Sequence, residues 1–235
     1  QTDYFFGHPW AFAILHCFGG ESHAHGDAPG LIDRVHELLE EAKPGTCEMY
    51  ATLPEITEYN GFYFELSAKL GWNPAAVTIE RYVKEYCQKR YGPDAAALEK
   101  AWWLLVDTIH GPESGTVKII MDPLYWFRPD LKLLHGWPED DERAIALWKS
   151  RPAFIRKMQQ SLEIFLSQDD LLETSEMLRR DVVDVARHLI AERFGQALLA
   201  ARDAFLEGDA NTLAASADLC LKLLDDQARL LASWP

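Results

Sequence analysis

The stretch that decides the fold is a short apolar run that ends in a proline and a carboxylate, Met49-Tyr50-Ala51-Thr52-Leu53-Pro54-Glu55. Its aromatic and β-branched residues favour an extended, pleated backbone. Pro54 has no backbone N–H and disfavours a helical conformation in the residue before it, so we expect the strand to end there. Glu55 then stands where the strand gives way to a loop.

The position of Glu55 allows two interpretations. In a parallel α/β barrel the catalytic groups gather at the C-terminal ends of the strands, which makes Glu55 a candidate catalytic carboxylate. The alternative is structural: Glu55 caps the helix that follows, because a carboxylate is stabilising near a helix N-terminus. The spacing of the residues leaves both interpretations open.

A second apolar run comes earlier in the chain. It covers residues 10–17, Trp10-Ala11-Phe12-Ala13-Ile14-Leu15-His16-Cys17, and is typical of a buried strand in a parallel sheet. It leads into Phe18-Gly19-Gly20, a loop whose glycines let the backbone approach a ligand or adopt positive φ. We interpret His16, at the strand end, as a hydrogen-bonding residue in a cleft or as a satisfied core histidine.

The rest of the chain has helical patterns. Residues 29–42 carry apolar side chains at helical spacing, so the first 60 residues form a strand–helix–strand βα repeat. Beyond Glu55 the pattern predicts only helices, over 57–71, 76–90, 94–109, 140–166, 170–207 and 209–233, with a loop-rich stretch over 110–142. Gly208 separates the last two helices, and Asp209 is the expected N-cap of the second. The predicted fold class is α/β followed by all-α, mostly helical overall.

Two groups of side chains in the helical part bear on function. Asp181 and Asp184 share a helix face, and we expect them to form surface ion pairs with the arginines beside them, Arg179, Arg180 and Arg187. The loop carries Tyr125, Trp126, Phe127 and Trp137. These aromatic residues either line a sugar-binding cleft or pack the loop onto the helices.

Composition excludes several functional classes. The chain has 235 residues, 23 basic against 37 acidic, and a net charge of −14, which argues against nucleic acid and anionic membrane surfaces as partners. It has no apolar run of about 18 residues, so nothing in it is expected to span a bilayer. Its four cysteines form neither a metal-type pair nor a disulfide framework, and we expect buried or partly buried thiols. His16, His23 and His25 lack a diagnostic ligand spacing, so no metal is expected.

The ends of the sequence predict a piece of a longer protein. The chain starts at Gln1 without a signal peptide and stops within a helical pattern. We therefore expect strands 10–17 and 49–53 to lack neighbours and to expose their edges.

Several motifs together resemble one known family. They are Pro9-Trp10 with Leu15-His16-Cys17-Phe18-Gly19-Gly20, then Pro54-Glu55-Ile56 with Tyr59-Asn60, Tyr63 and Leu66, then Leu70-Gly71-Trp72 and Arg90-Tyr91-Gly92. This combination resembles the α-N-acetylglucosaminidase family of glycoside hydrolases, the family of the lysosomal heparan sulfate enzyme and its bacterial relatives. The resemblance covers most of the 235 residues of this chain, but these correspond only to the middle of the family's longer chain. It implies the last βα units of a catalytic (β/α)8-type barrel over 1–72 and an incomplete, irregular α-helical C-terminal domain over 73–235.

The resemblance also implies an activity. It is retaining exo-hydrolysis of terminal α-linked N-acetylglucosamine, or a related sugar, from glycans through a covalent glycosyl-enzyme, without a cofactor. Such enzymes hold two carboxylates about 5–5.5 Å apart. Glu55 falls on the family's nucleophile, and the acid/base glutamate lies upstream of Gln1, so the fragment alone is expected to be inactive. The residues expected to line the pocket are Trp10, His16, Cys17, Phe18, Gly19, Gly20 and Asn60.

The implied partners are a glycan or glycoside substrate and the remainder of the polypeptide, with a homo-oligomer left open. Family members are soluble proteins of the lysosome or secreted by bacteria; the compartment of this chain is undetermined. The sequence departs from the family pattern at Cys17 and Ile56. These departures bear on the sugar specificity more than on the hydrolase class. They leave open a second hypothesis, a non-catalytic helical carbohydrate- or protein-binding module with a degenerate barrel remnant. A glutamate at a barrel strand end upstream of Gln1 would favour the enzyme.

Overall fold

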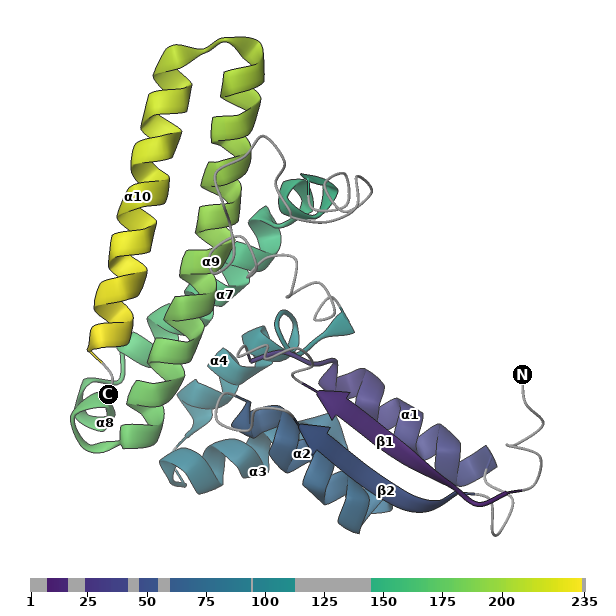
Figure 1. Ribbon diagram of the computed structural model, residues 1–235. Helices are drawn as coiled ribbons and strands as arrows, with labels where there is room; N and C mark the ends of the chain where they lie inside the picture. Colours follow the sequence, from purple (N-terminus) through teal and green to yellow (C-terminus); the bar gives the residue numbers. More distant parts are fainter. Residues whose placement is uncertain are drawn as a thin grey trace.

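The computed structural model describes residues 8–16, 24–41, 47–54, 60–93, 95–112 and 145–233. Two strands alternate with helices first, and helices alone follow, ending in two long neighbouring helices (Figure 1). The elements are β1 (Trp10–His16), α1 (Ala28–Glu41), β2 (Cys47–Pro54), α2 (Gly61–Trp72), the 3₁₀ turn η2 (Pro74–Ala76), α3 (Ile79–Tyr91), α4 (Ala96–Val106), α7 (Pro152–Leu166), α8 (Asp169–Thr174), α9 (Glu176–Glu207) and α10 (Ala210–Ala232). This order confirms the predicted fold class.

The two strands form a parallel pair, as predicted. They are joined through α1, and their register pairs Leu15 with Leu53 and His16 with Pro54. β2 ends at Pro54, in agreement with the prediction that this residue stops the strand. The C-terminal ends of both strands therefore lie side by side. In a parallel sheet, residues that follow adjacent strands leave the sheet at the same edge and so lie close together.

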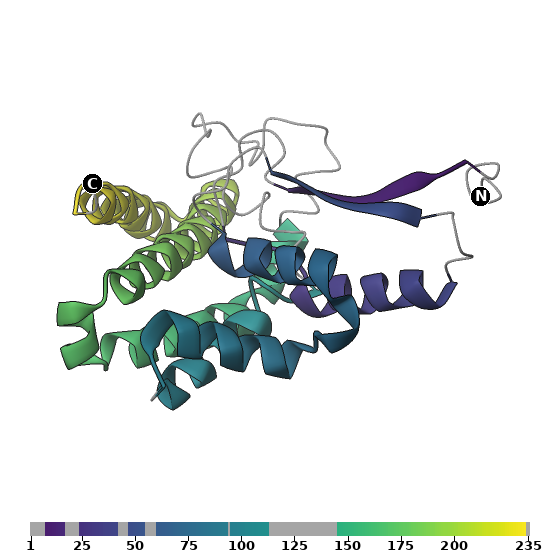
Figure 2. The same cartoon turned by 90° about the horizontal axis from the view of Figure 1, so that it is seen from below.

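Only one face of the strand pair is covered by described helices. Ile14 belongs to the core, and the Tyr50 hydroxyl hydrogen-bonds Ser67 of α2 at 3.1 Å. Figure 2 shows α1 and α2 on the same side of the strands. On the other face Leu15 is 58% exposed and Leu53 is 52% exposed. Parallel strands are normally apolar on both faces because both are buried.

An aromatic cluster holds the first helices together. Phe62 of α2 stacks on Trp102 of α4 with ring centroids 4.7 Å apart, and Tyr86 of α3 meets Trp102 edge-on at 4.8 Å. The Tyr82 hydroxyl donates to the Phe62 carbonyl at 2.5 Å. These rings lie in three stretches that the sequence predicted as helices, and their contacts pack α2, α3 and α4 against one another.

Two predicted helices are each divided in the structure. The expected helix over 140–166 has a turn at Arg151, and α7 begins at Pro152. Proline suits the first helical position but cannot donate the hydrogen bond that would continue a helix. The expected helix over 170–207 is interrupted at Ser175, whose side chain caps α9 by accepting from the Leu178 N–H.

The last two helices form a long hairpin. Gly208 ends α9 with φ +75°, and Asp209 accepts from the backbone N–H groups of Asn211 and Thr212 at the start of α10. Both features confirm the predicted break and cap. α10 packs on α9 and leaves most of its surface exposed (Figure 1).

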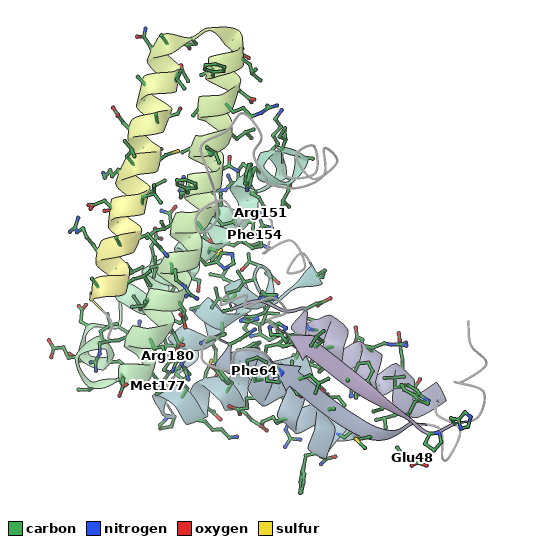
Figure 3. All side chains as sticks on the ribbon, in the orientation of Figure 1. Glu48, Phe64, Arg151, Phe154, Met177 and Arg180 are labelled. Carbon is green, nitrogen blue, oxygen red and sulfur yellow. The ribbon has the colours of Figure 1, made fainter. Side chains whose placement is uncertain are left out.

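A buried ion pair ties α7 to α9. Arg151 and Glu192 are both fully buried, with the arginine Nε 3.2 Å from each carboxylate oxygen. The guanidinium also lies over the Phe154 ring, 3.3 Å from its centroid (Figure 3). Burial alone would raise the pKa of Glu192, but the bonds to His188 and Arg151 prevail and lower it. The carboxylate is therefore ionised inside the helical layer.

The remaining expectations about the chain concern cysteines and membranes. Cys47, Cys87 and Cys220 are free thiols and are buried or partly buried, as expected, while Cys17 lies outside the described residues. Among the helices in the described ranges, none is long and apolar enough to cross a membrane.

We predict that Glu192→Ala lowers the free energy of unfolding of the complete protein by about 3–5 kcal/mol, because Arg151 then keeps a buried charge without this carboxylate. Chemical denaturation measures the loss. The double change Arg151→Met with Glu192→Leu should cost less than Glu192→Ala, because it leaves neither charge behind. The control is Glu37→Ala, which breaks the exposed pair with Arg34 (3.1 Å) and should cost less than about 1 kcal/mol. Equal losses at the two positions would contradict the prediction.

Candidate functional site

The side chain of His16 ends β1 inside a stack of rings. It is buried. Its ring stacks on the ring of His25, with centroids 4.4 Å apart, and on the ring of Tyr63, with centroids 4.6 Å apart. Phe64 meets it edge-on at 5.4 Å. The aromatic contacts hold the imidazole between the strand and α2, so its orientation is set by packing.

Asn60, immediately before α2, holds this imidazole ring by a polar contact. Its Nδ2 lies 2.6 Å from His16 Nε2 and 2.6 Å from the His25 carbonyl oxygen. A carbonyl accepts only from a donor, so the amide nitrogen must face this way, and Nε2 of His16 is an acceptor. Burial, followed by the nearby His25, lowers the pKa of His16 to about 3. The imidazole is therefore neutral at physiological pH and joins three segments of the chain.

The segment after residue 23 is anchored to the turn that follows α4. Gly26 donates its N–H to the Ile109 carbonyl at 3.1 Å, and Ala28 donates to the His110 carbonyl at 2.9 Å. Gly26 has φ +128°, and a Cβ there would lie 2.5 Å from the Tyr63 ring. Only glycine satisfies both the backbone conformation and the close approach.

His110 is a second buried, neutral histidine near these groups. Its ring lies 4.6 Å from Phe62 and 6.1 Å from Trp102. Burial lowers its pKa to about 3, helped by His25, His16 and His188, while the backbone of Gly26 raises it as a hydrogen-bond partner. Its Nδ1 has no hydrogen-bond partner within the described ranges.

The expectation that Asp181 forms a surface ion pair with arginines on its own helix is wrong. Asp181 is buried, and Arg90 of α3 binds its two carboxylate oxygens at 2.6 Å each. The Tyr91 hydroxyl donates to the same carboxylate. Burial raises the pKa of Asp181, with Arg90 acting against it. The partner lies 91 residues earlier in the chain, beyond the reach of an argument from local helix spacing.

Asp184 behaves closer to the prediction. Its nearest cation is the guanidinium of Arg187, 3.7 Å away on the same helix, and its side chain is 19% exposed. Burial raises the pKa of Asp184 to about 6, with Arg187 opposing this and Asp181 adding to it.

Several of the residues described above line a cavity of about 330 Å³, which we call the junction cavity. Its lining includes Asn60 and Phe62 at the start of α2, Trp102 and His110 at the end of α4, and Arg180 and Asp184 of α9. The cavity thus lies where the strand-bearing part of the chain meets the later helices. Its lining includes Ala24 and Asn60, the first described residues after β1 and β2.

A larger pocket of about 590 Å³ lies elsewhere, between α2 and α3. Its lining includes Glu85, which pairs with Lys69 at 2.5 Å and with Arg81 at 2.6 Å. Trp72 at its rim is 92% exposed. We place the candidate site at the junction cavity, because Asn60 in its lining contacts His16 at the end of β1, whereas Glu85 of the larger pocket is already paired with two cations.

Comparisons with known proteins bear on the whole chain. Residues 82–235 match the family model of the alpha-N-acetylglucosaminidase (NAGLU) C-terminal domain, and residues 1–74 match that of the alpha-N-acetylglucosaminidase (NAGLU) tim-barrel domain. The chain belongs to the alpha-N-acetylglucosaminidase family. The resemblance found in the motifs is thereby confirmed, and so is a fold that begins in a barrel and continues in helices.

Individual relatives agree with this assignment. Alpha-N-acetylglucosaminidase of Homo sapiens is 27% identical over 250 residues, covering 100% of this chain and 31% of the human protein. The family 89 glycoside hydrolase from Clostridium perfringens in complex with PUGNAc is similar in structure, with a TM-score of 0.73 and 18% identity over 97% of this chain. CpGH89 from Clostridium perfringens, in complex with its substrate GlcNAc-alpha-1,4-galactose, gives a TM-score of 0.72 and 18% identity over 98% of this chain. The chain spans about a third of the human relative and 25% of each of these structures.

The structure brings some of the predicted site residues of this family member together and separates others. His16 and Asn60 are in direct contact at the strand ends. Trp10 opens β1, six residues earlier, which is about 20 Å along an extended strand. The structure therefore does not join Trp10 to the other two. The other predicted site residues, Cys17, Phe18, Gly19, Gly20 and Glu55, lie outside the described residues. His23 and the aromatic residues at 125–127 and 137 lie outside them as well.

Several residues of the site were missed by the sequence argument. His25, Tyr63, His110 and Arg90 contribute contacts but were not predicted as site residues. Tyr63 and Arg90 were noted only as parts of motifs, and His25 only as a metal ligand that was not expected. A single histidine at the end of an apolar helix, just before Gly111-Pro112, was the available signal for His110. Among the described side chains, no group of three His, Cys, Asp or Glu residues is placed to hold a metal ion.

We predict that Gly26→Ala destabilises the complete protein more than Gly92→Ala does. Both glycines have positive φ, but a Cβ at Gly92 meets nothing within 4 Å, whereas at Gly26 it strikes Tyr63. Gly92→Ala should cost about 1 kcal/mol of backbone strain, and Gly26→Ala about 1–3 kcal/mol more. Thermal and chemical unfolding of the two variants measure the difference. Similar costs would show that the Tyr63 contact imposes no constraint.

We predict that His110 contributes to a loss of stability in acid. Its pKa is about 3 when folded and 6.5 ordinarily, so between these values the unfolded chain binds a proton that the folded chain does not. This contribution to stability is therefore complete above pH 6.5 and falls as the pH decreases toward 3. His110→Phe keeps a ring beside Phe62. Its free energy of unfolding should decline less steeply between pH 6.5 and 4, with a slope smaller by the equivalent of up to about one bound proton. Parallel pH profiles for the variant and the wild type would contradict the prediction.

Proposed function

We propose that the complete protein is a retaining, exo-acting glycoside hydrolase that removes terminal α-linked N-acetylglucosamine or a related sugar, with Glu55 as its nucleophile. Membership of the alpha-N-acetylglucosaminidase family supports the reaction class. The observation that carries the residue assignment is that β2 ends at Pro54, beside the end of β1. Glu55 is the next residue in the sequence, so it follows a parallel strand at the end where barrel enzymes place their catalytic groups.

The alternation of side chains along β2 supports the same assignment. The side chains of Tyr50 and Thr52 reach Ser67 of α2, whereas Leu53 is exposed on the opposite face together with its partner Leu15. In an extended strand, odd-numbered positions share one face. We therefore propose that Glu55, the next odd-numbered residue, is directed to the side away from α1 and α2, which is the inner side of a barrel.

The chemistry requires two carboxyl groups. The Glu55 carboxylate would attack the anomeric carbon of the sugar, and the glycosidic oxygen would leave with a proton supplied by the upstream acid/base glutamate. The resulting glycosyl ester would be hydrolysed by a water molecule that the second residue, now a base, deprotonates. No cofactor is needed, because each step moves only a proton and an electron pair between these groups. The fragment alone would be inactive, since one carboxylate does not perform both roles.

The residues around Glu55 would shape the sugar pocket. Asn60 and His16 hold the strand end and the start of α2 in a fixed geometry, so we assign them a positioning role near the nucleophile. Cys17, Phe18, Gly19, Gly20 and Trp10 remain proposed pocket residues. The division into a barrel part over 1–72 and a helical part over 73–235, and the remainder of the chain as its structural partner, also stay predictions.

We predict that Glu55→Gln in the complete protein lowers kcat on a chromogenic α-N-acetylglucosaminide by on the order of 10³-fold or more, because the nucleophile is lost while the shape is kept. The matched control is Glu48→Gln. This is the same chemical change on β2 at an exposed position (Figure 3), and it should leave kcat unchanged.

A second variant tests the role of the nucleophile directly. Azide added to Glu55→Ala should restore turnover and yield a glycosyl azide of inverted configuration, because the small anion occupies the space of the missing carboxylate. Full activity in Glu55→Gln would refute the assignment. Sugar binding without turnover in the wild type would favour the non-catalytic binding module instead.

A further inference from the structure

His25 lies where three parts of the chain meet, although it belongs to no helix or strand. Its ring stacks on the ring of His16 with centroids 4.4 Å apart, and its backbone carbonyl accepts from Asn60 Nδ2 at 2.6 Å. His16 and Asn60 also contact each other. His25 therefore contacts each member of the pair that joins the end of β1 to the start of α2.

The helical part of the chain fixes the segment that follows His25. The Gly26 N–H donates to the Ile109 carbonyl at 3.1 Å. The Ala28 N–H donates to the His110 carbonyl at 2.9 Å. Both carbonyls belong to the turn after α4, which is buried and closed by hydrogen bonds of its own. Because these bonds join main chain to main chain, the turn sets where the backbone just after His25 lies.

His16 and Asn60 in turn hold the stretch to which we assign the nucleophile. His16 pairs with Pro54 in the register of the strands, and the His16 ring contacts Asn60. Pro54 and Asn60 are the described residues on either side of the stretch that contains Glu55 in the sequence. His16 therefore holds both ends of this short stretch, and His25 holds His16 by stacking.

These contacts lie on the side of the strands that the helices cover. The side chains of Ile14 and His16 are two residues apart on β1, so they share a face, and both are buried. Glu55 is assigned to the opposite side, where the sugar would bind. His25 is therefore placed to act on Glu55 through the main chain, and no contact between His25 and the sugar is expected.

We propose that His25 is a positioning residue for Glu55 and that the turn after α4 holds His25 in place. The helical part of the chain thereby sets the position of the nucleophile without touching it. This inference rests on the proposed function, because it takes Glu55 as the nucleophile. A displacement of about 1 Å at a reacting group can lower the rate on the order of 10²-fold, so loosening of these contacts should be visible in kcat.

The first test compares two substitutions of His25 in the complete protein. His25→Ala removes the stacked ring and should lower kcat on a chromogenic α-N-acetylglucosaminide about 10- to 100-fold. KM should change less than about threefold, because the sugar contacts are kept. His25→Phe retains a ring against His16 and should recover most of the lost rate. The control is His36→Ala, the same change on α1, where His36 Nε2 lies 2.9 Å from the Pro74 carbonyl oxygen; it should leave kcat unchanged.

Azide rescue separates positioning from a structural defect. In Glu55→Ala the attacking group is an azide ion from solution, so the placement of the Glu55 side chain no longer affects the rate. His25→Ala should therefore cost little when it is added to Glu55→Ala in the presence of azide, although it lowers kcat when Glu55 is present. An equal penalty in both backgrounds would overturn the inference, because His25 would then act on the fold or on the sugar.

A change in the turn tests the contribution of the helical part. A Cβ at Gly111 would lie 2.5 Å from the Val106 carbonyl oxygen, so Gly111→Ala must displace the turn. Gly111→Ala should lower kcat, and the loss should be smaller in the His25→Ala background, since both changes act through the same contacts. Losses that simply multiply would refute the role of the turn.

The outcomes distinguish this inference from the proposed function. An active wild type that loses turnover in Glu55→Gln but keeps its full kcat in His25→Ala would retain the hydrolase and refute the positioning role. A wild type without turnover on any α-glycoside, or a fully active Glu55→Gln variant, would refute the proposed function. The positioning role of His25 would then be refuted with it.

Discussion

The side-chain amide of Asn60 is the contact on which the site depends. Its nitrogen bonds the ring of His16 and the carbonyl of His25 at the same time, so the end of β1, the segment that leads into α1 and the start of α2 are held by one group. Asn60 is 44 residues from His16 and 35 residues from His25 in the sequence, so the contact is tertiary. A buried amide held by two bonds on one side has a fixed orientation, and its oxygen is thereby aimed away from the histidines. The same contact thus shapes the strand ends and leaves an acceptor for the junction cavity.

The later helices are bound to this centre by buried charge as well as by apolar packing. Arg90 reaches from α3 to Asp181 on α9, and Trp102 donates through Tyr91 to the same network. Arg151 and Glu192 repeat the arrangement between α7 and α9. Buried ion pairs add little stability compared with apolar substitutes, but their directionality allows few alternative packings. We infer that they specify where α9 lies, and so which of its side chains line the cavity.

The fold was predictable from the sequence wherever a local signal decided it. Pro54 ended a strand and Gly208 with Asp209 divided a hairpin as expected, because φ restriction and capping act within a few residues. The two missed helix breaks, at Arg151 and Ser175, also had local signals, but continuous apolar spacing obscured them. The site was less predictable: His16 was recognised as a hydrogen-bonding histidine, whereas the pairing of Asp181 with Arg90 arises from tertiary packing. The spacing of residues along a helix shows which of them share a face of that helix. It does not show which distant helix or strand packs against that face.

The strand pair has a consequence for how the protein is made. Leu15 and Leu53 adjoin on a face that no described helix covers, although the opposite face is packed against α1 and α2. Synthesis proceeds from the N-terminus, so during translation β1 emerges before α1, and both strands emerge before α2. Until both faces are covered, an apolar parallel ribbon is open to pairing with other chains. We therefore expect the rate of chain elongation, which sets how long this ribbon stays uncovered, to affect the yield of folded protein.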